Sequence, residues 1–292
     1  MMVRGLLVAS LMLLAACVST SAPPEIASNN AIRIGSFNIA FIRDPEGLPK
    51  WEARRDAVAA VVEDMQADVL AFQEMETFAG GPFNPVNRQL DWVLENAPQY
   101  RVAATGEVSS FPSTQPILYR ADRLALLEQG WFFFSETPGV IFSSGFDGGF
   151  SSYASTARFR DQRTGTAFTI INVHTDARSA KNRLGASELI TERAEKLIEA
   201  GEPVIVLGDF NATRFSRTVR PLLDLGLTGT GLVLPTYHLG LGLGATPAVD
   251  HILVSREFGE ARDIEVYRGR YEGSFPSDHY PIQATYDLAG GL

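Results

Sequence analysis

One stretch of the sequence decides the fold: Val204-Ile205-Val206-Leu207-Gly208-Asp209-Phe210-Asn211-Ala212. Four β-branched or leucine residues run directly into a glycine. A continuous apolar run that ends at a turn residue is typical of a strand buried on both faces. Asp209 and Asn211 follow two positions apart, so their side chains point the same way if the chain stays extended. α/β proteins often place their chemistry at such strand ends. Asp and Asn after a glycine also favour a simple turn, so this stretch alone leaves both interpretations open.

The composition of the chain is that of a globular protein. Of its 292 residues, 45% are hydrophobic and 20% are charged. A domain of this length buries about three quarters of the surface that its unfolded chain exposes, so it needs no disulfide or metal to fold. The 25 Lys and Arg residues stand against 34 Asp and Glu residues, a formal net charge of −9. This balance disfavours non-specific binding to duplex nucleic acid, which depends on cationic side chains. A nuclease with a local basic cleft is still compatible with it.

The first 17 residues are interpreted as an export signal. Arg4 supplies a short positive region, and the apolar run Leu6–Leu14 is too short to span a bilayer. The run leads to Ala15-Ala16-Cys17, which resembles the lipobox of bacterial lipoproteins. That resemblance implies that Cys17 is lipidated and becomes the mature N-terminus; an ordinary secreted protein with an incidental cysteine is the alternative. Val18 directly after the cysteine resembles the pattern of lipoproteins that are sent to the outer membrane. Residues 18–30 have the composition of a flexible tether. We therefore expect an exported, membrane-anchored protein in the outer membrane or facing the periplasm.

Residues 31–288 are predicted to form one domain with two β-sheets and covering helices. A strand, a helix and a strand follow one another at Ala31–Ile39, Trp51–Met65 and Asp68–Phe72, which is the βα arrangement of layered folds. The further predicted strands are Gln115–Arg120, Leu124–Phe134, Tyr153–Asp161, Ala167–Val173, Val249–Ser255, Asp263–Tyr267 and Tyr280–Asp287. The further predicted helices are Pro85–Asn96, Ser179–Ala200 and Arg217–Leu225.

Polar side chains that can perform chemistry follow or end many of these apolar runs. Any one of them could be a turn residue or a helix cap. Carboxylates, amides and histidines at so many strand ends of one domain are hard to explain in that way together, so we interpret them as one site. They are Asn38, Glu74, His174, Asp209, Asn211, Asp250, Asp278 and His279.

On these residues the sequence resembles the endonuclease/exonuclease/phosphatase superfamily, the deoxyribonuclease I-like fold. The resemblance covers residues 32–287, and the motifs occur in the family's order. It implies an α/β (α+β) four-layer sandwich, in which two mixed β-sheets pack face to face between helical layers. The motifs are Ser36-Phe37-Asn38, Gln73-Glu74, Asn172-Val173-His174, Gly208-Asp209-Phe210-Asn211, the strand containing Asp250, and Ser277-Asp278-His279; the fourth and the last are the most specific.

The resemblance also implies metal-assisted hydrolysis of a phosphoester. Glu74 is the expected main ligand of Mg²⁺, because this hard cation prefers carboxylate oxygens, water and substrate phosphate. Mn²⁺ and Ca²⁺ are the alternative metals. Asp278 and Asn38 would complete the surroundings of the metal, directly or through water. The metal would neutralise charge on the phosphoryl oxygens and the leaving group.

Five residues are expected to act on the attacking water and the phosphate. Asp209 would orient and deprotonate the water, and Asn211 would hold the water or a phosphate oxygen. His279 would lie against the phosphate, paired with Asp250, because a carboxylate fixes the imidazole tautomer and favours its charged form. His174 would donate to a phosphoryl oxygen as negative charge builds there. Whether Asp209 or His279 is the base, and whether one or two metals act, is left open.

Three features depart from the family pattern or stay outside it. Many relatives carry a basic residue shortly before the position of Asp250, where this chain has Pro247-Ala248-Val249, so one phosphate contact is in doubt. We interpret Asp176, two residues after His174, as a loop acid and not as a ligand. We interpret His251 as a structural residue that faces away from Asp250 along the strand.

The substrate cannot be taken from the fold, because relatives cut nucleic acids, inositol phosphates, sphingolipids and other phosphoesters. A surface lipoprotein meets extracellular material, so a nuclease or another phosphodiesterase is the expected function. A phosphoesterase for phospholipid, inositol phosphate or sugar phosphate is the alternative, and a catalytically inactive binding protein is a third hypothesis. We expect the protein to be monomeric and held at a membrane by its N-terminal lipid.

Overall fold

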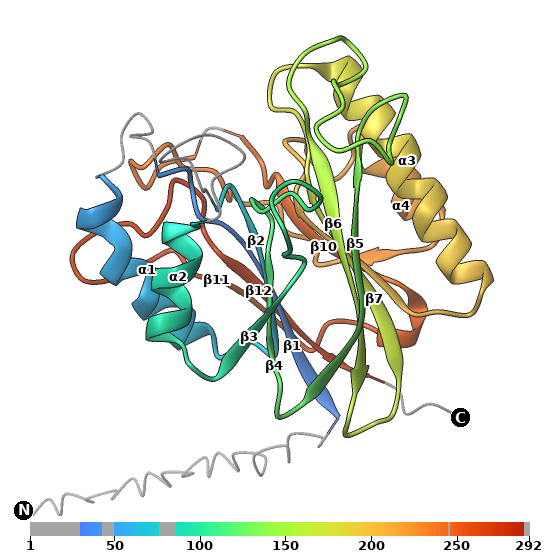
Figure 1. The fold of residues 1–292 in the computed structure, drawn as a ribbon. Helices are drawn as coiled ribbons and strands as arrows, with labels where there is room; N and C mark the ends of the chain where they lie inside the picture. Colours follow the sequence, from blue (N-terminus) through green and yellow to red (C-terminus); the bar gives the residue numbers. More distant parts are fainter. Residues whose placement is uncertain (1–29, 43–49, 76–85, 245, 289–292) are drawn as a thin grey trace, which may run out of the picture.

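The computed structural model describes residues 30–42, 50–75, 86–244 and 246–288. Cys17 and the leader lie outside this part, so their predicted roles stay predictions. Within the described ranges, twelve strands form two sheets of six strands each, and helices cover the outer faces of both sheets (Figure 1). This confirms the predicted arrangement of two mixed sheets between helical layers. No helix in the described ranges is long and apolar enough to cross a membrane.

The first sheet has the strand order β11-β12-β1-β2-β4-β3. The predicted strand–helix–strand unit is present, with β1 and β2 in parallel pairing and α1 between them in the chain. Helices α1 and α2 pack on the outer face of this sheet. Its elements are β1 Ala31–Asn38, α1 Trp51–Met65, β2 Val69–Gln73, α2 Arg88–Asn96, β3 Tyr100–Ala103, β4 Ile117–Arg120, β11 Asp263–Val266 and β12 Ile282–Asp287.

The second sheet has the strand order β5-β6-β7-β8-β10-β9. Its one parallel pair among the described strands is β7 and β8, connected through the long helix α3. Helices α3 and α4 pack on its outer face. Its elements are β5 Leu124–Phe133, β6 Tyr153–Asp161, β7 Ala167–His174, α3 Ala180–Glu199, β8 Val204–Asp209, α4 Arg220–Asp224, β9 Thr228–Gly229 and β10 Asp250–Val254, with the 3-10 helix Arg256–Phe258 after β10.

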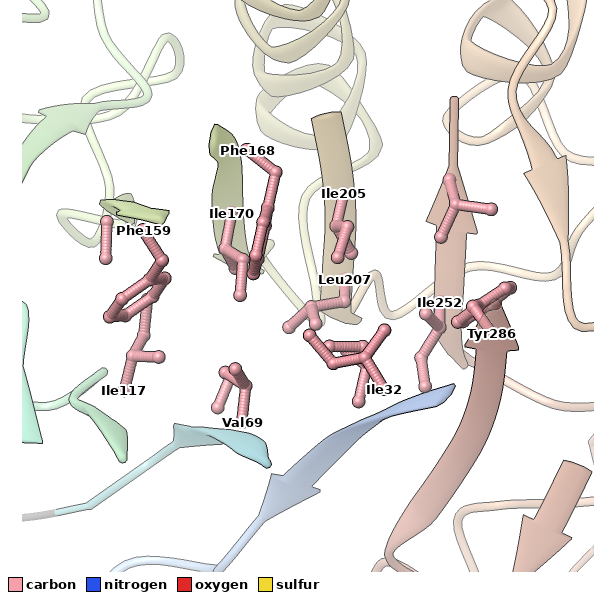
Figure 2. Packing of buried hydrophobic residues seen from close by; sticks show 14 of the residues in the cluster. Ile32, Val69, Ile117, Phe159, Phe168, Ile170, Ile205, Leu207, Ile252 and Tyr286 are labelled. Carbon is pink, nitrogen blue, oxygen red and sulfur yellow. The ribbon is translucent and has the colours of Figure 1, made fainter. Parts of the chain in front are cut away.

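The core explains why β8 is apolar at every position. Ile205 and Leu207 lie in the core between the two sheets, close to residues of the facing sheet such as Ile32 (Figure 2). Val204 and Val206 point the other way and pack in the layer between the sheet and α3. All four side chains are fully buried. The prediction of a strand buried on both faces is therefore confirmed.

Two predicted helices differ from the structure in their bounds for identifiable reasons. α2 begins at Arg88, because the Asn87 side chain caps it by accepting a hydrogen bond from the Leu90 N–H. Val86, which lies within the predicted range 85–96, precedes the helix and is exposed. The helix expected at 217–225 is only the short α4, which begins one residue before Pro221, and proline favours the first turn of a helix. Pro85 itself lies outside the described residues.

Candidate active site

Strand pairing brings the polar strand ends of both sheets to one edge of the sandwich. His174, which ends β7, is level with Asp209, which ends β8, in parallel register. Asp250, which begins β10, is level with Asp209 in antiparallel register. In the other sheet, β1 ends at Asn38, and Glu74 directly follows its parallel neighbour β2. We call the edge of the sandwich that carries these strand ends the catalytic edge.

Gly208 allows β8 to approach β7 closely just before Asp209. Its φ is +132°, and a Cβ atom added there would lie 2.0 Å from the backbone oxygen of Val173. Only glycine accepts both this conformation and this contact. The glycine of the Gly-Asp-Phe-Asn motif is therefore required by the packing that positions the aspartate after it.

The Oδ2 atom of Asp209 is the point on which the other side chains converge. It accepts a hydrogen bond from Asn38 Nδ2 at 3.1 Å, and the same Nδ2 donates to Glu74 Oε1 at 3.1 Å. His174 Nε2 lies 3.7 Å from Asp209 Oδ2 and 3.5 Å from Glu74 Oε1. His279 Nε2 lies 3.8 Å from Asp209 Oδ2. Side chains from both sheets therefore surround one buried carboxylate.

Asn38 holds two carboxylates in place and does not turn its amide oxygen toward them. The oxygen accepts a hydrogen bond from the Ala40 N–H at 3.0 Å, which leaves Nδ2 to bridge Glu74 and Asp209. The residue therefore lies where the sequence predicted it, beside Glu74. In this geometry it orients the carboxylates through its amide nitrogen.

Asn211 also lies at the catalytic edge, but the chain does not stay extended there, so of the two open interpretations the structure has the turn. Its φ is +45°, so the chain turns into the left-handed conformation directly after β8. Its N–H donates to Asp209 Oδ1 at 2.8 Å, and its Nδ2 donates to the carbonyl of Thr175 at 2.9 Å. Asn211 thus fixes the Asp209 carboxylate and ties the loop after β8 to the loop after β7.

Asp250 and His279 form the pair that their motifs predicted. Asp250 Oδ2 and His279 Nδ1 are 2.9 Å apart and both side chains are buried. The ring of Tyr237 packs on the His279 ring with 4.8 Å between centroids. The imidazole is therefore held by a carboxylate on one nitrogen and presents its other nitrogen toward Asp209.

Burial and neighbouring charges together set the pKa values of the two central groups, Asp209 and His279. Burial raises the pKa of Asp209, and the Asp250 charge raises it further, against the lowering effect of His279 and His174. Burial lowers the pKa of His279, but the carboxylates of Asp250 and Asp209 outweigh it, so the net pKa lies well above the ordinary value. The arrangement favours a protonated imidazole beside a carboxylate that can take up a proton near neutral pH.

The donor set at the catalytic edge fits a hard divalent cation. Glu74, His174 and Asp209 each offer a ligand atom, and these atoms lie within 4.8 Å of one another. Glu74 has a φ of +59°, a costly conformation for a non-glycine residue, and its Oε2 accepts from the Phe41 N–H. Carboxylate oxygens in such a group are the ligands that Mg²⁺ and Mn²⁺ prefer. Asp278 belongs to neither of the two such groups in the described ranges; it is half-buried and accepts from Ser277 Oγ at 3.3 Å.

Arg54 is a residue of the site that the sequence analysis missed. It lies on the buried face of α1, and its guanidinium donates to the carbonyls of Ile39, Ala40, Phe41 and Pro276 at 2.6–3.1 Å. Burial lowers its pKa to about 10, while the charges of Asp278 and Glu74 act to raise it. It joins the loop after Asn38 to the segment before Asp278. The signal was its spacing, because position 54 falls on the apolar face that begins at Trp51.

Hydroxyl groups hold the loops that carry the remaining motif residues. Ser277 Oγ donates to the carbonyl of Asn38 at 2.6 Å and accepts from the His279 N–H at 3.1 Å. Thr236 Oγ1 accepts from the N–H groups of Val249 and Asp250. Neither was a predicted site residue, although Ser277 belongs to the predicted Ser277-Asp278-His279 motif.

Two residues that we set aside are structural. His251 is buried and its Nε2 lies 2.9 Å from the carbonyl oxygen of Ala212. Asp176 Oδ1 accepts from the N–H groups of Arg178 and Ser179, and its Oδ2 accepts from Asn182 Nδ2, so it orders the start of α3.

Comparison with known proteins agrees with this geometry. The model of the endonuclease/exonuclease/phosphatase family matches residues 35–279. No curated protein sequence matches the chain. A Bacteroides thetaiotaomicron protein of that family is 24% identical with a TM-score of 0.73, covering 88% of this chain and 97% of its own.

Two solved structures with named activities share the fold. Mannosyl-6-phosphatase Bt3783 from B. thetaiotaomicron is 23% identical, has a TM-score of 0.70, and covers 87% of this chain and 98% of its own. D. rerio TDP2, in complex with a single-stranded DNA product, is 14% identical with a TM-score of 0.64, covering 88% and 99%. Since the family model matches most of its length, the chain belongs to the endonuclease/exonuclease/phosphatase family.

Proposed function

We propose that the chain is a divalent-metal-dependent phosphoesterase that hydrolyses a phosphodiester outside the cytoplasm. The observation that carries the proposal is the convergence of Asn38, Glu74, His174 and His279 on the buried carboxylate of Asp209. A structural role would explain one or two such contacts. Two carboxylates and two histidines that face one point from both sheets match what attack of water on phosphorus needs.

Asp209 is assigned as the general base. Its raised pKa, caused first by burial, brings the group closer to neutral pH, where a base is most efficient. The Asn211 N–H and Asn38 Nδ2 each hold one of its oxygens, so the carboxylate has a fixed direction from which to accept the proton of water.

His279 is assigned as the charged donor to a phosphoryl oxygen. The Asp250 carboxylate supports the protonated ring, whose pKa lies above its ordinary value despite burial, and this favours Asp209 over His279 as the base. His174 Nε2 faces the same space and would donate to a second phosphoryl oxygen. Donors placed before the reaction stabilise charge as it develops and need no rearrangement.

Glu74 would be the main ligand of the divalent cation, with Asp278 in its surroundings, while Asp209 and His174 of the same donor group keep the roles of base and donor. The cation supplies positive charge for the phosphoryl oxygens and the leaving group. Asn38 fixes the carboxylates of Glu74 and Asp209 through its amide nitrogen, and Arg54 holds the backbone after Asn38 and before Asp278.

The proposal includes export and membrane attachment through Cys17, on the basis of the lipobox resemblance alone. A protein held at a cell surface meets nucleic acid and lipid phosphodiesters from outside. A phosphomonoester is the second candidate substrate, because a relative of similar fold is described as a mannosyl-6-phosphatase.

The test uses purified protein that begins at residue 18, with Mg²⁺ or Mn²⁺. The substrates are DNA, RNA, a phospholipid, mannose 6-phosphate and bis(p-nitrophenyl) phosphate. We expect hydrolysis that EDTA abolishes and that Asp209→Asn lowers by roughly 10²-fold or more. Asp224→Asn, an exposed carboxylate of α4, serves as the matched control and should change nothing. Full activity in EDTA or in Asp209→Asn would refute the proposal.

A further inference from the structure

Exposed apolar side chains gather on the catalytic edge. The described residues include twelve large apolar side chains that are exposed, and ten of them lie in loops that enter or leave the sheets at this edge. The other two, Leu127 and Ile264, lie within β5 and β11. The ten are Phe41, Val86, Val140, Phe150, Phe215, Val233, Leu234, Leu239, Leu241 and Leu243. Single exposed apolar residues are normal, but a group of them around one site indicates an interaction surface.

Half of these side chains belong to one segment, residues 230–244, which we call the apolar loop. Leu241 is 65% exposed and Leu243 is 77% exposed. Leucine and glycine alternate from Leu239 to Gly244, so no polar side chain separates the leucines. The sequence from Leu225 to Val249 contains no Asp, Glu, Lys or Arg, although a fifth of the whole chain is charged. Such a surface suits an occupant without charge.

The apolar loop is built onto the catalytic motifs. The His238 N–H donates to the carbonyl of Asp278 at 2.8 Å, and the Tyr280 N–H donates to the carbonyl of Thr236 at 2.8 Å. Tyr237, between these two, packs on the ring of His279. The exposed aliphatic residues flank this fixed segment on both sides. Whatever covers them is therefore held beside His279.

We propose that the apolar loop docks the catalytic edge onto a neutral lipid surface, and that the substrate is a phosphodiester in a lipid headgroup. This inference rests on the phosphoesterase function proposed above and names its substrate class. The occupant must leave the site open to substrate, and a lipid surface does so because it carries the substrate itself. A protein seated on loops all around the edge would cover the site.

Nucleic acid fits this surface less well. Binding to a nucleic-acid backbone depends on Lys and Arg, and single strands stack their bases on aromatic side chains along a basic groove. The apolar loop itself offers leucine and valine and carries no cation; Arg268, outside the segment, donates to the carbonyl of Pro235 at 2.7 Å. Aliphatic side chains gain free energy by leaving water for the hydrocarbon boundary of a lipid layer.

The predicted anchor is compatible with this orientation. β1 begins at the end of the sandwich opposite to Asn38, and its eight residues span about 26 Å. A tether of residues 18–30 reaches at most about 45 Å when extended. The lipid at Cys17 would therefore allow the catalytic edge to turn back to the membrane that holds it.

The first experiment measures binding to neutral phosphatidylcholine vesicles by flotation, at low and at high NaCl concentration. The protein begins at residue 18, because the described residues that build both sheets start later and the lipidation site is then absent. We expect binding that survives high salt, since the apolar loop is uncharged. Leu241→Ser/Leu243→Ser should weaken it by about tenfold or more. Leu127→Ser, an exposed leucine of β5, is the matched control and should bind like the wild type.

The second experiment compares hydrolysis of vesicle-borne phospholipid with hydrolysis of soluble bis(p-nitrophenyl) phosphate. The ratio of the two rates should fall about tenfold in Leu241→Ser/Leu243→Ser and stay constant in Leu127→Ser. Equal loss of both rates would mean that the loop only supports His279, and it would overturn the proposal. So would absent vesicle binding, binding lost at high salt, or a dimer that the loop variant abolishes. A wild type that binds vesicles but cleaves no phosphoester would instead refute the proposed function.

Discussion

The pair of Asp250 and His279 gives the sharpest test of the proposed mechanism. Asp250→Asn keeps the size of the side chain and removes its charge, whereas His279→Ala removes the ring. The ring is buried, and 2.9 Å separate its Nδ1 from the carboxylate. If Asp250 acts only through the ring, then removing the carboxylate after the ring is gone should have little further effect on the rate.

The expected sizes follow from this geometry. A positioned acid–base group contributes roughly 10²–10⁴-fold in rate, so His279→Ala should raise the barrier by about 3–5 kcal/mol. The contact that Asp250 makes is a hydrogen bond to a charged group, worth about 1.5–3 kcal/mol, so Asp250→Asn should slow the enzyme roughly 10- to 10²-fold. The double variant should lose little more than His279→Ala alone, which gives a coupling energy of about 1.5–3 kcal/mol.

The assay is the initial rate of phosphodiester hydrolysis at saturating substrate and Mg²⁺ for the wild type and the three variants. Urea unfolding of each protein shows whether the fold is kept, because Asp250 also lies at the start of a buried strand. Losses that multiply in the double variant would mean that the two residues act independently, and the reasoning would be refuted.

Four further predictions follow from the structure and the sequence. Glu74→Gln should abolish Mg²⁺-dependent hydrolysis while the unfolding midpoint stays near the wild-type value; full activity would remove Glu74 from the metal site. Arg54→Lys keeps the positive charge but loses the planar guanidinium that donates to four carbonyls. Mg²⁺ binding measured by calorimetry should therefore weaken by about 10- to 100-fold. Unchanged binding would make Arg54 a purely structural residue. Burial lowers the pKa of His238 to about 4, below its unfolded value of 6.5, so the unfolded chain binds the proton first and stability is lost as the pH falls from about 6.5 to 4. Between pH 7 and pH 5 this histidine should account for about 2 kcal/mol of the unfolding free energy, and His238→Phe should reduce that dependence in urea titrations. Cys17→Ala should stop lipid processing and release the protein from membranes; a wild type that is soluble with an unmodified N-terminus would reject the lipobox interpretation.

Most of the fold could be predicted because the central strands are continuous apolar runs in the sequence, which indicates that they are buried. The run from Val204 to Leu207 is apolar at every position, since alternate residues enter two different cores. The two strands that were missed lack such a pattern. Tyr100–Ala103 has only four positions, with buried residues at its two ends alone, and Thr228–Gly229 is two residues long. Strands this short depend on their neighbours in the sheet for their existence.

Most residues that meet at the catalytic edge were predictable, and so was the pairing of Asp250 with His279, but most of the other contacts were not. A polar residue after a buried strand is visible in the sequence, which is why Asp209 and His174 could be named. The left-handed turn at Asn211 and the use of the Asn38 amide oxygen by Ala40 depend on local backbone geometry that spacing does not reveal. Arg54 was missed because a charged residue on an apolar helix face is usually interpreted as exposed.

The charges at the catalytic edge connect burial to the direction of proton transfer. Asp209 and Asp250 are both buried and lie on either side of the His279 imidazole. A neutral imidazole would leave two carboxylates without a counter-charge away from water, which is costly. The protonation states of lower energy place a proton on the ring or on one of the carboxylates. The ring already has the 2.9 Å contact with Asp250 that favours its charged form. A phosphodiester that enters brings one more negative charge, which further favours a cationic His279 and a bound divalent metal. Under these conditions His279 has no capacity to accept a proton from water, which supports the proposed assignment of Asp209 as the base.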